Sequence, residues 1–346
     1  MENVLDILQW YKKNFRELPW RTTKDPYKIW LSEIILQQTQ VKQGLAYYDK
    51  FILKYPTAGH LAAASEEEVL KMWQGLGYYT RARNLHKTAK IIHDEYQGVF
   101  PDQYPVLSKL PGIGDYTASA ILSFSYLLPF PVLDGNVFRF LSRLYDIHLP
   151  INEQKNRKVF KDILETLIVG VNPSDFNNAI MELGALICKP DSPRCSECPV
   201  SMHCIALKNQ TIQELPVKLK KAKHKVRYFN YLYVREDHHF YLVKREDKDI
   251  WRNLYQLPLI ESMDPMDEKN MSATLNAWLQ PGDKYQLRKQ HLSKHLLTHQ
   301  TIYATFWELV LERKPAFQGD GYKKVSLKNY TKYPIPVLIE NFLLSL

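Results

Sequence analysis

Cysteine is scarce in this chain of 346 residues, and the four that occur all lie between Cys188 and Cys204. A disulfide framework would spread cysteines along the fold, so this grouping indicates a single metal or cluster site. Long apolar runs are also missing, because the most apolar stretch, 116–133, contains hydroxyl residues and is interrupted by prolines. The opening residues, MENVLDILQW, have acids where a signal peptide has a basic start. We therefore expect a cytoplasmic protein without a membrane span.

Acidic side chains are too few to balance the basic ones, which leaves a net charge of +9 and a pI of about 9.1. A basic excess favours a polyanionic partner, either nucleic acid or an anionic membrane surface, although it also promotes simple solubility. Hydrophobic residues make up 45% of the chain, so at this length two domains can each bury a core.

The first two hundred residues lack the alternating pattern of strands and carry helix signals instead. Asp25 followed by Pro26 is a helix start, and Ser65 with Glu68 forms a capping box. A further helix opens at Pro173 and runs toward the cysteines. These signals predict a mainly α domain over residues 1–206.

Large apolar residues become rare after residue 207, where lysine is frequent. This composition predicts a basic linker over 207–227. Alternating aromatic and β-branched runs follow it at 228–234, 240–243 and 301–311, and the last residues, 334–346, look helical. We therefore expect a smaller α+β domain over residues 228–346.

The cysteine spacing, C-x6-C-x2-C-x5-C, is compatible with zinc or with a four-iron, four-sulfur cluster. Structural zinc sites usually pair two short knuckles, and only one short spacing occurs here. The pattern over 188–204 resembles the iron–sulfur loop of the endonuclease III superfamily of DNA glycosylases. The resemblance implies one 4Fe–4S cluster, and a structural zinc is the alternative. The implied ligands are Cys188, Cys195, Cys198 and Cys204.

A glycine-containing turn, Leu110-Pro-Gly-Ile-Gly114, precedes a helical stretch that begins at Asp115. Gly112 and Gly114 allow positive φ, and the exposed backbone N–H groups of such a turn can bind a phosphate. Alone the motif could be a plain helix–helix turn. Together with the cysteine loop it resembles the helix-hairpin-helix element of the same superfamily.

The residue two positions after Gly114 is Tyr116. Superfamily members that also cut the sugar–phosphate backbone carry a lysine there, which forms a Schiff base with the sugar. A phenol cannot form that imine, so we expect base removal without a strong lyase step. Lys109 lies close enough in sequence to leave weak lyase activity open.

Two carboxylates stand in environments that suit different roles. Glu33 is a lone acid in an apolar helix, so burial should keep it protonated as a general acid, and Trp30 and Gln37 on its face could hold a planar base. An exposed residue on an amphipathic helix is the alternative. Asp134 precedes a helical run whose N-terminus should keep it ionised and able to stabilise an oxocarbenium ion. A simple helix cap is the alternative there.

These motifs occur in the order and spacing of MutY adenine glycosylases, and the resemblance covers residues 5–206. It implies that duplex DNA with adenine opposite 8-oxoguanine is the substrate. Glu33 would be the general acid at adenine N7 and Asp134 the carboxylate at the sugar carbon, supported by Tyr116 and Asn136. The residues implied to contact or wedge beside the oxidised guanine are Gln38, Thr39, Leu76 and Tyr78.

The segment Trp251–Pro258 resembles the tryptophan–proline segment of Nudix-like domains, whereas the acidic Nudix hydrolase box is absent. We therefore expect a binding module and not a second enzyme. The Phe-Ser-His loop with which MutY proteins read oxidised guanine would correspond to Leu297, Thr298 and His299. Only the histidine is identical, and these residues could instead cap the strand beginning at Thr301.

Two other functions remain open at this point. A thymine or uracil mismatch glycosylase of the same superfamily would be shorter and would not need the second domain. A non-catalytic lesion-scanning iron–sulfur protein would need the hairpin and the cysteines but not Glu33 together with Asp134. The combined features favour a monofunctional adenine glycosylase, acting as a monomer at the nucleoid.

Overall fold

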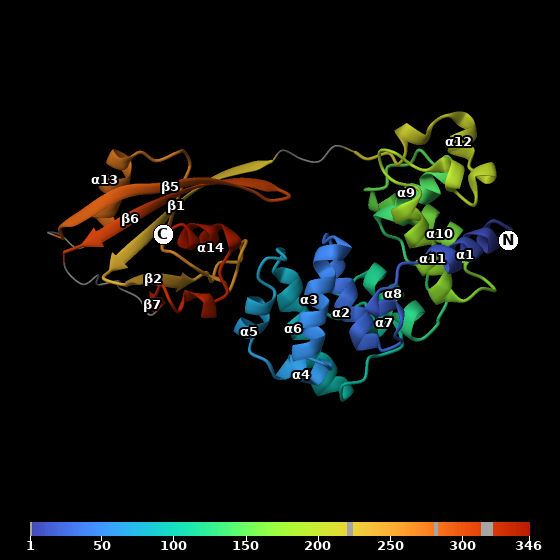
Figure 1. Cartoon of the computed structure of the whole chain (residues 1–346), viewed down its shortest axis with the longest axis horizontal. Coiled ribbons are helices and arrows are strands. Elements are labelled where there is room, and N and C mark those ends of the chain that lie inside the picture. Colours follow the sequence, from blue (N-terminus) through green and yellow to red (C-terminus); the bar gives the residue numbers. More distant parts are fainter. Residues whose placement is uncertain (1, 220–223, 280–282, 313–320) are drawn as a thin grey trace. The chain divides into compact units, whose positions relative to one another are not determined.

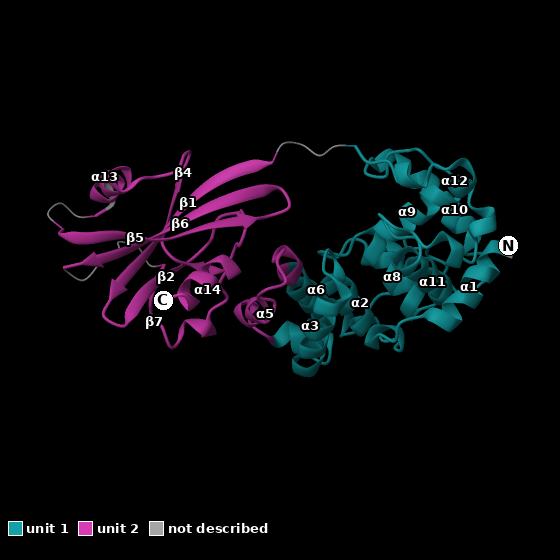
Figure 2. Ribbon diagram, turned by 45° about the horizontal axis from the view of Figure 1, so that its top comes forward, with its two compact units in different colours: residues 1–63, 84–221 teal, residues 64–83, 222–346 magenta. Residues whose placement is uncertain are grey.

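The computed structural model describes residues 2–219, 224–279, 283–312 and 321–346. They form two compact units (Figure 2): residues 1–63 and 84–221 make the first, and residues 64–83 and 222–346 make the second. In the described part of the chain, no helix is long and apolar enough to cross a membrane.

The first unit is helical throughout its described residues (Figure 1), as the sequence predicts. The helices that belong wholly to this unit are α1 (Glu2–Asn14), α2 (Pro26–Leu36), α3 (Val41–Lys54), α4 (Ala58–Ala63), α7 (Tyr104–Leu107), α8 (Asp115–Ser125), α9 (Gly135–Leu144), α10 (Arg157–Leu167), α11 (Pro173–Leu186) and α12 (Ile205–Asn209). Helix α6 (Thr80–Tyr96) contains the boundary between the units.

Local capping chemistry sets several helix starts. The Asp25 carboxylate accepts a hydrogen bond of 2.9 Å from the Tyr27 backbone N–H, and α2 begins between them. Asp134 caps α9 through a 2.7 Å bond from the Val137 N–H. These two caps confirm the predicted helix starts. Behind Asp134, α9 packs with α1, α10 and α11 through buried apolar side chains, so the cap lies at the edge of a rigid core.

The segment predicted as a solvated linker is partly folded. Helix α12 and a 3₁₀ turn at Ile212–Glu214 occupy its first half, where the apolar side chains of Ile212 and Leu215 are buried. Arg143 fixes this segment by donating hydrogen bonds to the carbonyl oxygens of both residues, at 3.0 and 3.1 Å. The frequent lysines of the segment conceal these few buried contacts, so composition alone overestimates the length of the tether.

The second unit contains a mixed seven-stranded sheet in the order β3-β2-β1-β6-β5, with β4 paired to β1 and β7 paired to β2. Strands β1 and β6 are parallel, and the other pairs are antiparallel. The predicted strand runs are confirmed within β1, β2 and β6. The strands are β1 (Lys225–Glu236), β2 (His239–Lys244), β3 (Tyr255–Gln256), β4 (Leu259–Ser262), β5 (Tyr285–Leu296), β6 (Gln300–Leu311) and β7 (Tyr322–Ser326).

A helix packs against each face of the sheet. On one face, Met271 and Leu275 of α13 (Glu268–Trp278) contact Leu232, Trp307 and neighbouring apolar residues. On the other face, Phe342 of α14 (Val337–Leu344) stacks on Phe306 with the ring centroids 4.2 Å apart. Helix α5 (Glu66–Met72) also belongs to this unit.

Candidate active site

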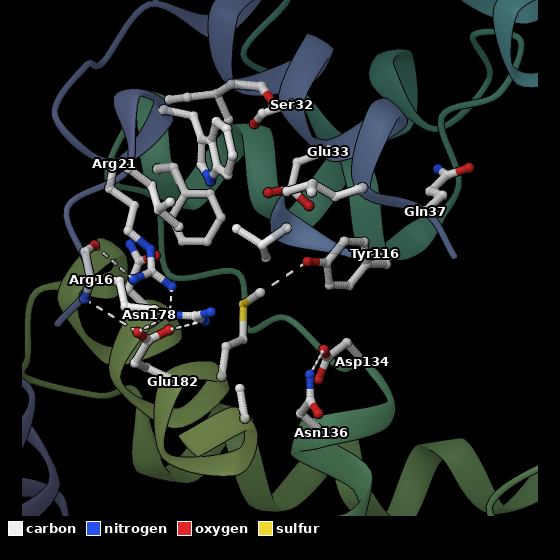
Figure 3. Close-up of a pocket in the computed structure, with 18 of the residues that line it drawn as sticks. Arg16, Arg21, Ser32, Glu33, Gln37, Tyr116, Asp134, Asn136, Asn178 and Glu182 are labelled. Atoms are coloured by element: carbon white, nitrogen blue, oxygen red, sulfur yellow. Dashed lines mark hydrogen bonds and ion pairs between the residues drawn. The ribbon is translucent and has the colours of Figure 1, made fainter. Parts of the chain in front are cut away.

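A cavity of about 580 Å³ opens among α2, α8, α9 and α11 of the first unit (Figure 3). The four residues predicted to carry the chemistry, Glu33, Tyr116, Asp134 and Asn136, all line it. They come from three helices that are distant in sequence, so the fold brings together what the sequence only indicated. Of the residues expected to contact the opposite base, the cavity lining includes Gln38 and Thr39.

Glu33 projects from α2 with only 7% of its surface exposed. Burial raises the pKa of its carboxyl group to about 7, and the nearby Asp134 adds to this shift. A hydrogen bond with the Tyr116 hydroxyl acts in the opposite direction because it stabilises the carboxylate. At neutral pH the group is therefore divided between the acid and the anion, which suits proton donation.

Tyr116 lies on the first turn of α8, with its hydroxyl toward the centre of the cavity. Burial raises its pKa well above the ordinary value of 10, and the carboxylates of Glu33 and Asp134 raise it further. The phenol therefore stays protonated and serves as a hydrogen-bond donor. Its oxygen also lies 3.9 Å from Met181 Sδ.

Asp134 has a different set of partners. Besides the Val137 N–H, the side-chain amide of Asn136 donates to its carboxylate at 2.8 Å (Figure 3). Burial nevertheless raises the pKa of Asp134 above its ordinary value, against the effect of these donors and of Arg139. The N–H groups at the start of α9 thus favour the ionised form, as expected from the sequence, whereas desolvation opposes it.

A chain of hydrogen bonds runs from Asp134 to the cysteine segment. Arg139 donates at 2.9 Å to the Asn136 side-chain oxygen and at 2.7 Å to the Cys188 carbonyl oxygen. Helices α9 and α11 approach closely here, since a Cβ on Gly184 would come within 2.9 Å of Asn136. The orientation of Asn136 thus depends on the packing of the cysteine segment.

The opposite end of the cavity holds an ion cluster that the sequence analysis missed. The buried Glu182 accepts from Arg16 at 2.6 and 2.8 Å and from Arg21 at 2.6 Å. Burial alone would raise the pKa of Glu182, but the two arginines outweigh it and lower the pKa to about 2. Glu182 is the only acid in the apolar second half of α11, so a signal similar to that at Glu33 could have found it.

The tryptophan that lines the cavity is not the one predicted from the sequence. Trp30 is fully buried and packs on Phe100 at a centroid distance of 5.2 Å, and it does not line the cavity. Trp20, beside Arg21, lines the cavity instead. The prediction for Trp30 is wrong because α2 is covered on several sides, so its faces cannot be assigned from helical spacing alone.

The four cysteines line one small pocket together with Arg143. Among the described residues, no group of cysteine, histidine or acidic side chains converges as the ligands of a single metal ion. Four thiols around one small pocket form a donor set of the kind that holds an iron–sulfur cluster or a structural zinc. Arg143 Nη1 lies 3.5 Å from Cys188 Sγ, so a positively charged group faces the cysteines.

The two glycines of the predicted hairpin differ in conformation. Gly112 has a φ of +79°, and a Cβ there would lie 2.9 Å from Asn84. Gly114 has a φ of −93° and precedes α8 as its N-cap, with open space where a Cβ would stand. Positive φ is therefore required only at Gly112, and Gly114 leaves room for a ligand to approach the backbone.

The other predicted lesion contacts lie around a pocket of about 340 Å³ in the second unit. Leu76 and Tyr78 line it together with Thr298 and His299 of the β5–β6 turn. The hydroxyl groups of Tyr78 and Thr298 share a hydrogen bond. The structure thus separates the predicted lesion contacts into two groups, since Gln38 and Thr39 line the cavity of the first unit.

The loop that carries Tyr78 is held in an unusual conformation. Tyr78 has a φ of +45°, in the left-handed region that an aromatic residue rarely adopts. The Arg81 guanidinium lies 5.0 Å from the Trp73 ring and donates to the carbonyl oxygens of Leu76 and Gly77, at 3.1 and 3.2 Å. Arg81 therefore supports the backbone that presents Tyr78.

Both units match known families. Residues 31–166 match the HhH-GPD superfamily of base excision DNA repair proteins, and residues 230–345 match the NUDIX domain. The adenine DNA glycosylase of Buchnera aphidicola subsp. Baizongia pistaciae is 38% identical over 323 residues, which cover 91% of this chain and 88% of the relative. The chain belongs to the adenine DNA glycosylase family. It is accordingly a DNA glycosylase, and the MutY resemblance seen in its sequence is confirmed.

A second relative and a solved structure extend the comparison. The adenine DNA glycosylase of Arabidopsis thaliana is 35% identical over 324 residues, covering 82% of this chain and 51% of the relative. The solved structure of a thermostable thymine-DNA glycosylase aligns with a TM-score of 0.55 and 30% identity. It covers 60% of this chain and 95% of the thymine enzyme, so this adenine DNA glycosylase family member has a further region outside that alignment.

Proposed function

We propose that the chain removes adenine paired with 8-oxoguanine by hydrolysing the N-glycosidic bond of an extruded nucleotide. The observation that carries this proposal is the presence of Glu33 and Asp134 in one cavity, with Glu33 at a pKa of about 7. Glu33 donates a proton to adenine N7, which makes the base a better leaving group. Asp134 stabilises the positive charge that develops on the sugar, as the second carboxylate does in glycosidases.

Tyr116 and Asn136 act as supporting donors in this reaction. The phenol of Tyr116 stays protonated and stabilises the Glu33 carboxylate after proton transfer. Asn136 holds the Asp134 carboxylate through its 2.8 Å bond, and Arg139 fixes the orientation of the Asn136 amide. Because the position after the hairpin is a tyrosine, the reaction ends at an abasic site.

The Glu182 cluster binds the base at the other end of the cavity. Both Glu182 oxygens already accept two N–H groups each, so the arginines are the groups that can meet a ligand. Adenine offers ring nitrogen acceptors, which match the remaining N–H donors of Arg21. Trp20 supplies an aromatic wall to the same cavity. This end therefore selects a purine with acceptor nitrogens along its edge.

Recognition of the opposite base belongs to the remaining predicted contacts. In the second unit, Tyr78 and Leu76 fill the gap left by the extruded nucleotide, and Thr298 and His299 meet the oxidised guanine. Gln38 and Thr39 of the first unit line its cavity and supply further contacts to the DNA. Gly112 and Gly114 contribute backbone N–H groups to a phosphate. One chain supplies all these groups, so we expect a monomer to act on each mispair.

A panel of end-labelled duplexes tests the substrate. The duplexes contain adenine opposite 8-oxoguanine, adenine opposite guanine, or thymine or uracil opposite guanine. We expect alkali-dependent strand cleavage at adenine, fastest opposite 8-oxoguanine. Cleavage at thymine or uracil would support the mismatch-glycosylase alternative, and tight binding without any abasic site would support a lesion-scanning protein.

Borohydride trapping tests the absence of a lyase step. The wild-type chain should give no covalent adduct with an abasic duplex, whereas Tyr116→Lys should give one because an amine can form the imine. Lys109→Gln is the control, since a weak adduct that disappears in this variant would assign residual lyase activity to Lys109.

The cysteines hold one 4Fe–4S cluster in this proposal, and the cluster keeps the segment that contacts Arg139 and Arg143 in place. Metal analysis of the purified protein should give about four iron atoms and four sulfides per chain, and no zinc. A finding of one zinc and no iron per chain would show that the cysteines hold a structural zinc and not a cluster. Cys198→Ser should lose iron and lower the midpoint of thermal unfolding.

A further inference from the structure

One half of a sheet face in the second unit is uncovered. Strands β1, β6 and β5 lie side by side, and their register places Tyr228 beside Tyr303 and Tyr303 beside Lys294. Residues that pair side by side across the three strands form one row. The rows before and after this one add further side chains to the same face, because residues two positions apart along a strand share a face. We call this surface the tyrosine platform. It consists of Val226, Tyr228, Leu292, Lys294, Leu296 and Tyr303.

Helix α13 covers only the other half of this face. Its buried residues contact Leu232 and Trp307, which lie one row and more beyond the platform along the strands. The platform side chains therefore remain open: Leu296 is 68% exposed, Leu292 62%, and Tyr303 41%. Exposed apolar and aromatic side chains that gather on one face usually mark a binding surface.

The chemistry of the platform suits a polyanion. The Tyr228 and Tyr303 rings stack at 5.6 Å, and Lys294 Nζ lies 5.6 Å from the Tyr303 ring centroid. The platform spans the three rows that contain Val226, Tyr228 and Leu292. Among their described residues on β1, β6 and β5, none carries a carboxylate. The opposite face differs, since its Arg227 pairs with Glu261 at 2.7 Å. The charge of Arg227 is thus neutralised on the opposite face, whereas the charge of Lys294 remains available on the platform.

The platform is continuous with the turn proposed to reach the oxidised guanine. Leu296 belongs to the platform and also lines the pocket that contains Thr298 and His299. Lys294 lies two residues before Leu296, the last residue of β5, which is about 7 Å along an extended strand. That length corresponds to about two phosphates of one DNA strand. A duplex whose mispair lies at the turn would carry its backbone along the platform.

We propose that the tyrosine platform binds the sugar–phosphate backbone of the duplex on one side of the mispair. Lys294 contacts a phosphate, and Tyr303 with the two leucines packs against deoxyribose. The inference rests on the proposed function, because it takes the β5–β6 turn to be at the mispair. It adds to that function a contact with undamaged flanking DNA, which would hold the enzyme at a lesion independently of the base.

Binding to asymmetric duplexes tests this surface in the full-length protein. Each duplex carries a tetrahydrofuran abasic analogue opposite 8-oxoguanine, with long flanks on both sides or with one flank shortened to four base pairs. The wild-type protein should lose affinity when one particular flank is short. Lys294→Gln should bind the long duplex about fivefold more weakly and should bind the duplex lacking that flank as the wild type does. The salt dependence of its affinity should fall by about 0.9 in logarithmic slope.

Matched variants separate this contact from general charge effects. Lys328→Gln removes an exposed lysine after β7 and should behave as the wild type on all three duplexes. Tyr303→Ser should reproduce the effect of Lys294→Gln, whereas Tyr303→Phe should retain the wild-type affinity. If Lys294→Gln equals Lys328→Gln on every duplex, or weakens all three duplexes equally, the proposal is overturned. The first of these outcomes would indicate that the platform binds a protein partner and not DNA.

The readout also separates this inference from the proposed reaction. Adenine release is measured by alkali-labile cleavage, and the platform is measured by the effect of flank length on affinity. A chain that releases no adenine but keeps the flank effect refutes the reaction and supports the surface. A chain that releases adenine without any flank effect refutes the surface alone.

Discussion

The cavity of the first unit contains two buried glutamates whose electrostatic states are opposite. Glu33 lies among apolar side chains with one phenol as partner, and its pKa rises to about 7. Glu182 is also buried but is held by Arg16 and Arg21, and its pKa falls to about 2. Burial acts in the same direction on both groups, so the difference comes from the partners. One end of the cavity is thereby suited to exchanging a proton and the other to holding fixed charge.

Removing the exchangeable proton should have the largest effect. We expect Glu33→Gln to slow adenine release about 10³-fold in single-turnover reactions, because general acid catalysis is lost while the shape of the side chain is kept. Affinity for a duplex with an abasic analogue should stay near the wild-type value. The exposed Glu17→Gln is the control and should react normally. Wild-type rates in Glu33→Gln would exclude Glu33 as the acid.

Removing the fixed charge should chiefly affect stability. Glu182→Gln leaves two arginines without their anion, so we expect the free energy of unfolding to fall by about 3–5 kcal/mol at pH 7 in urea titrations. Glu165→Gln is the matched control. Its carboxylate lies 3.5 Å from Lys161 at the surface, and its loss should change stability by less than about 0.5 kcal/mol. Equal effects in the two variants would contradict the importance of the buried cluster.

The pH dependence of stability should distinguish the two glutamates. Glu33 binds its proton more tightly in the folded chain, so its contribution is fully present below its ordinary pKa of 4.5 and is lost as the pH rises through about 7. The wild type should therefore lose about 3 kcal/mol relative to Glu33→Gln between pH 4.5 and pH 8. Glu182 has the opposite sign, since its contribution is lost only as the pH falls from 4.5 toward 2.

Urea titrations of the wild type and Glu33→Gln at several pH values measure this difference. A constant difference in unfolding free energy from pH 5 to pH 8 would show that the Glu33 pKa is not raised in the folded chain.

The smallest expected effect concerns the partner of Glu33. Tyr116→Phe removes a hydrogen bond that lowers the pKa of Glu33, so that pKa should rise further. The rate of adenine release, which we expect to fall above pH 7 in the wild type, should then fall only at higher pH. The maximal rate should decrease about tenfold, because the donor that stabilises the carboxylate is missing. Measurements of the rate from pH 5 to pH 9 test both effects. An unshifted pH profile would show that Tyr116 does not influence the pKa of the general acid.

Local features of the fold were accessible from the sequence because they depend on neighbouring residues. The cap at Asp134 follows from residues within one turn. The alternating strands of the second unit were visible for the same reason, whereas β5 was not predicted, since most of its side chains are exposed and do not alternate clearly. Helix α13 was missed as well, although Asp267 is a helix-capping residue and accepts a 2.8 Å hydrogen bond from the Asn270 N–H.

By itself, the sequence determined the chemical inventory: the four cysteines, the tyrosine in place of a lysine at 116, and a lone acid at Glu33. Only the tertiary structure decided how this inventory is used. Arg16 and Glu182 are separated by 166 positions and meet at 2.6 Å, and no local pattern connects them. Likewise, the choice of Trp20 over Trp30 as the cavity wall depends on which helix faces the core covers. Burial and ion pairing between distant segments set the pKa values, and those contacts exist only after the chain has folded.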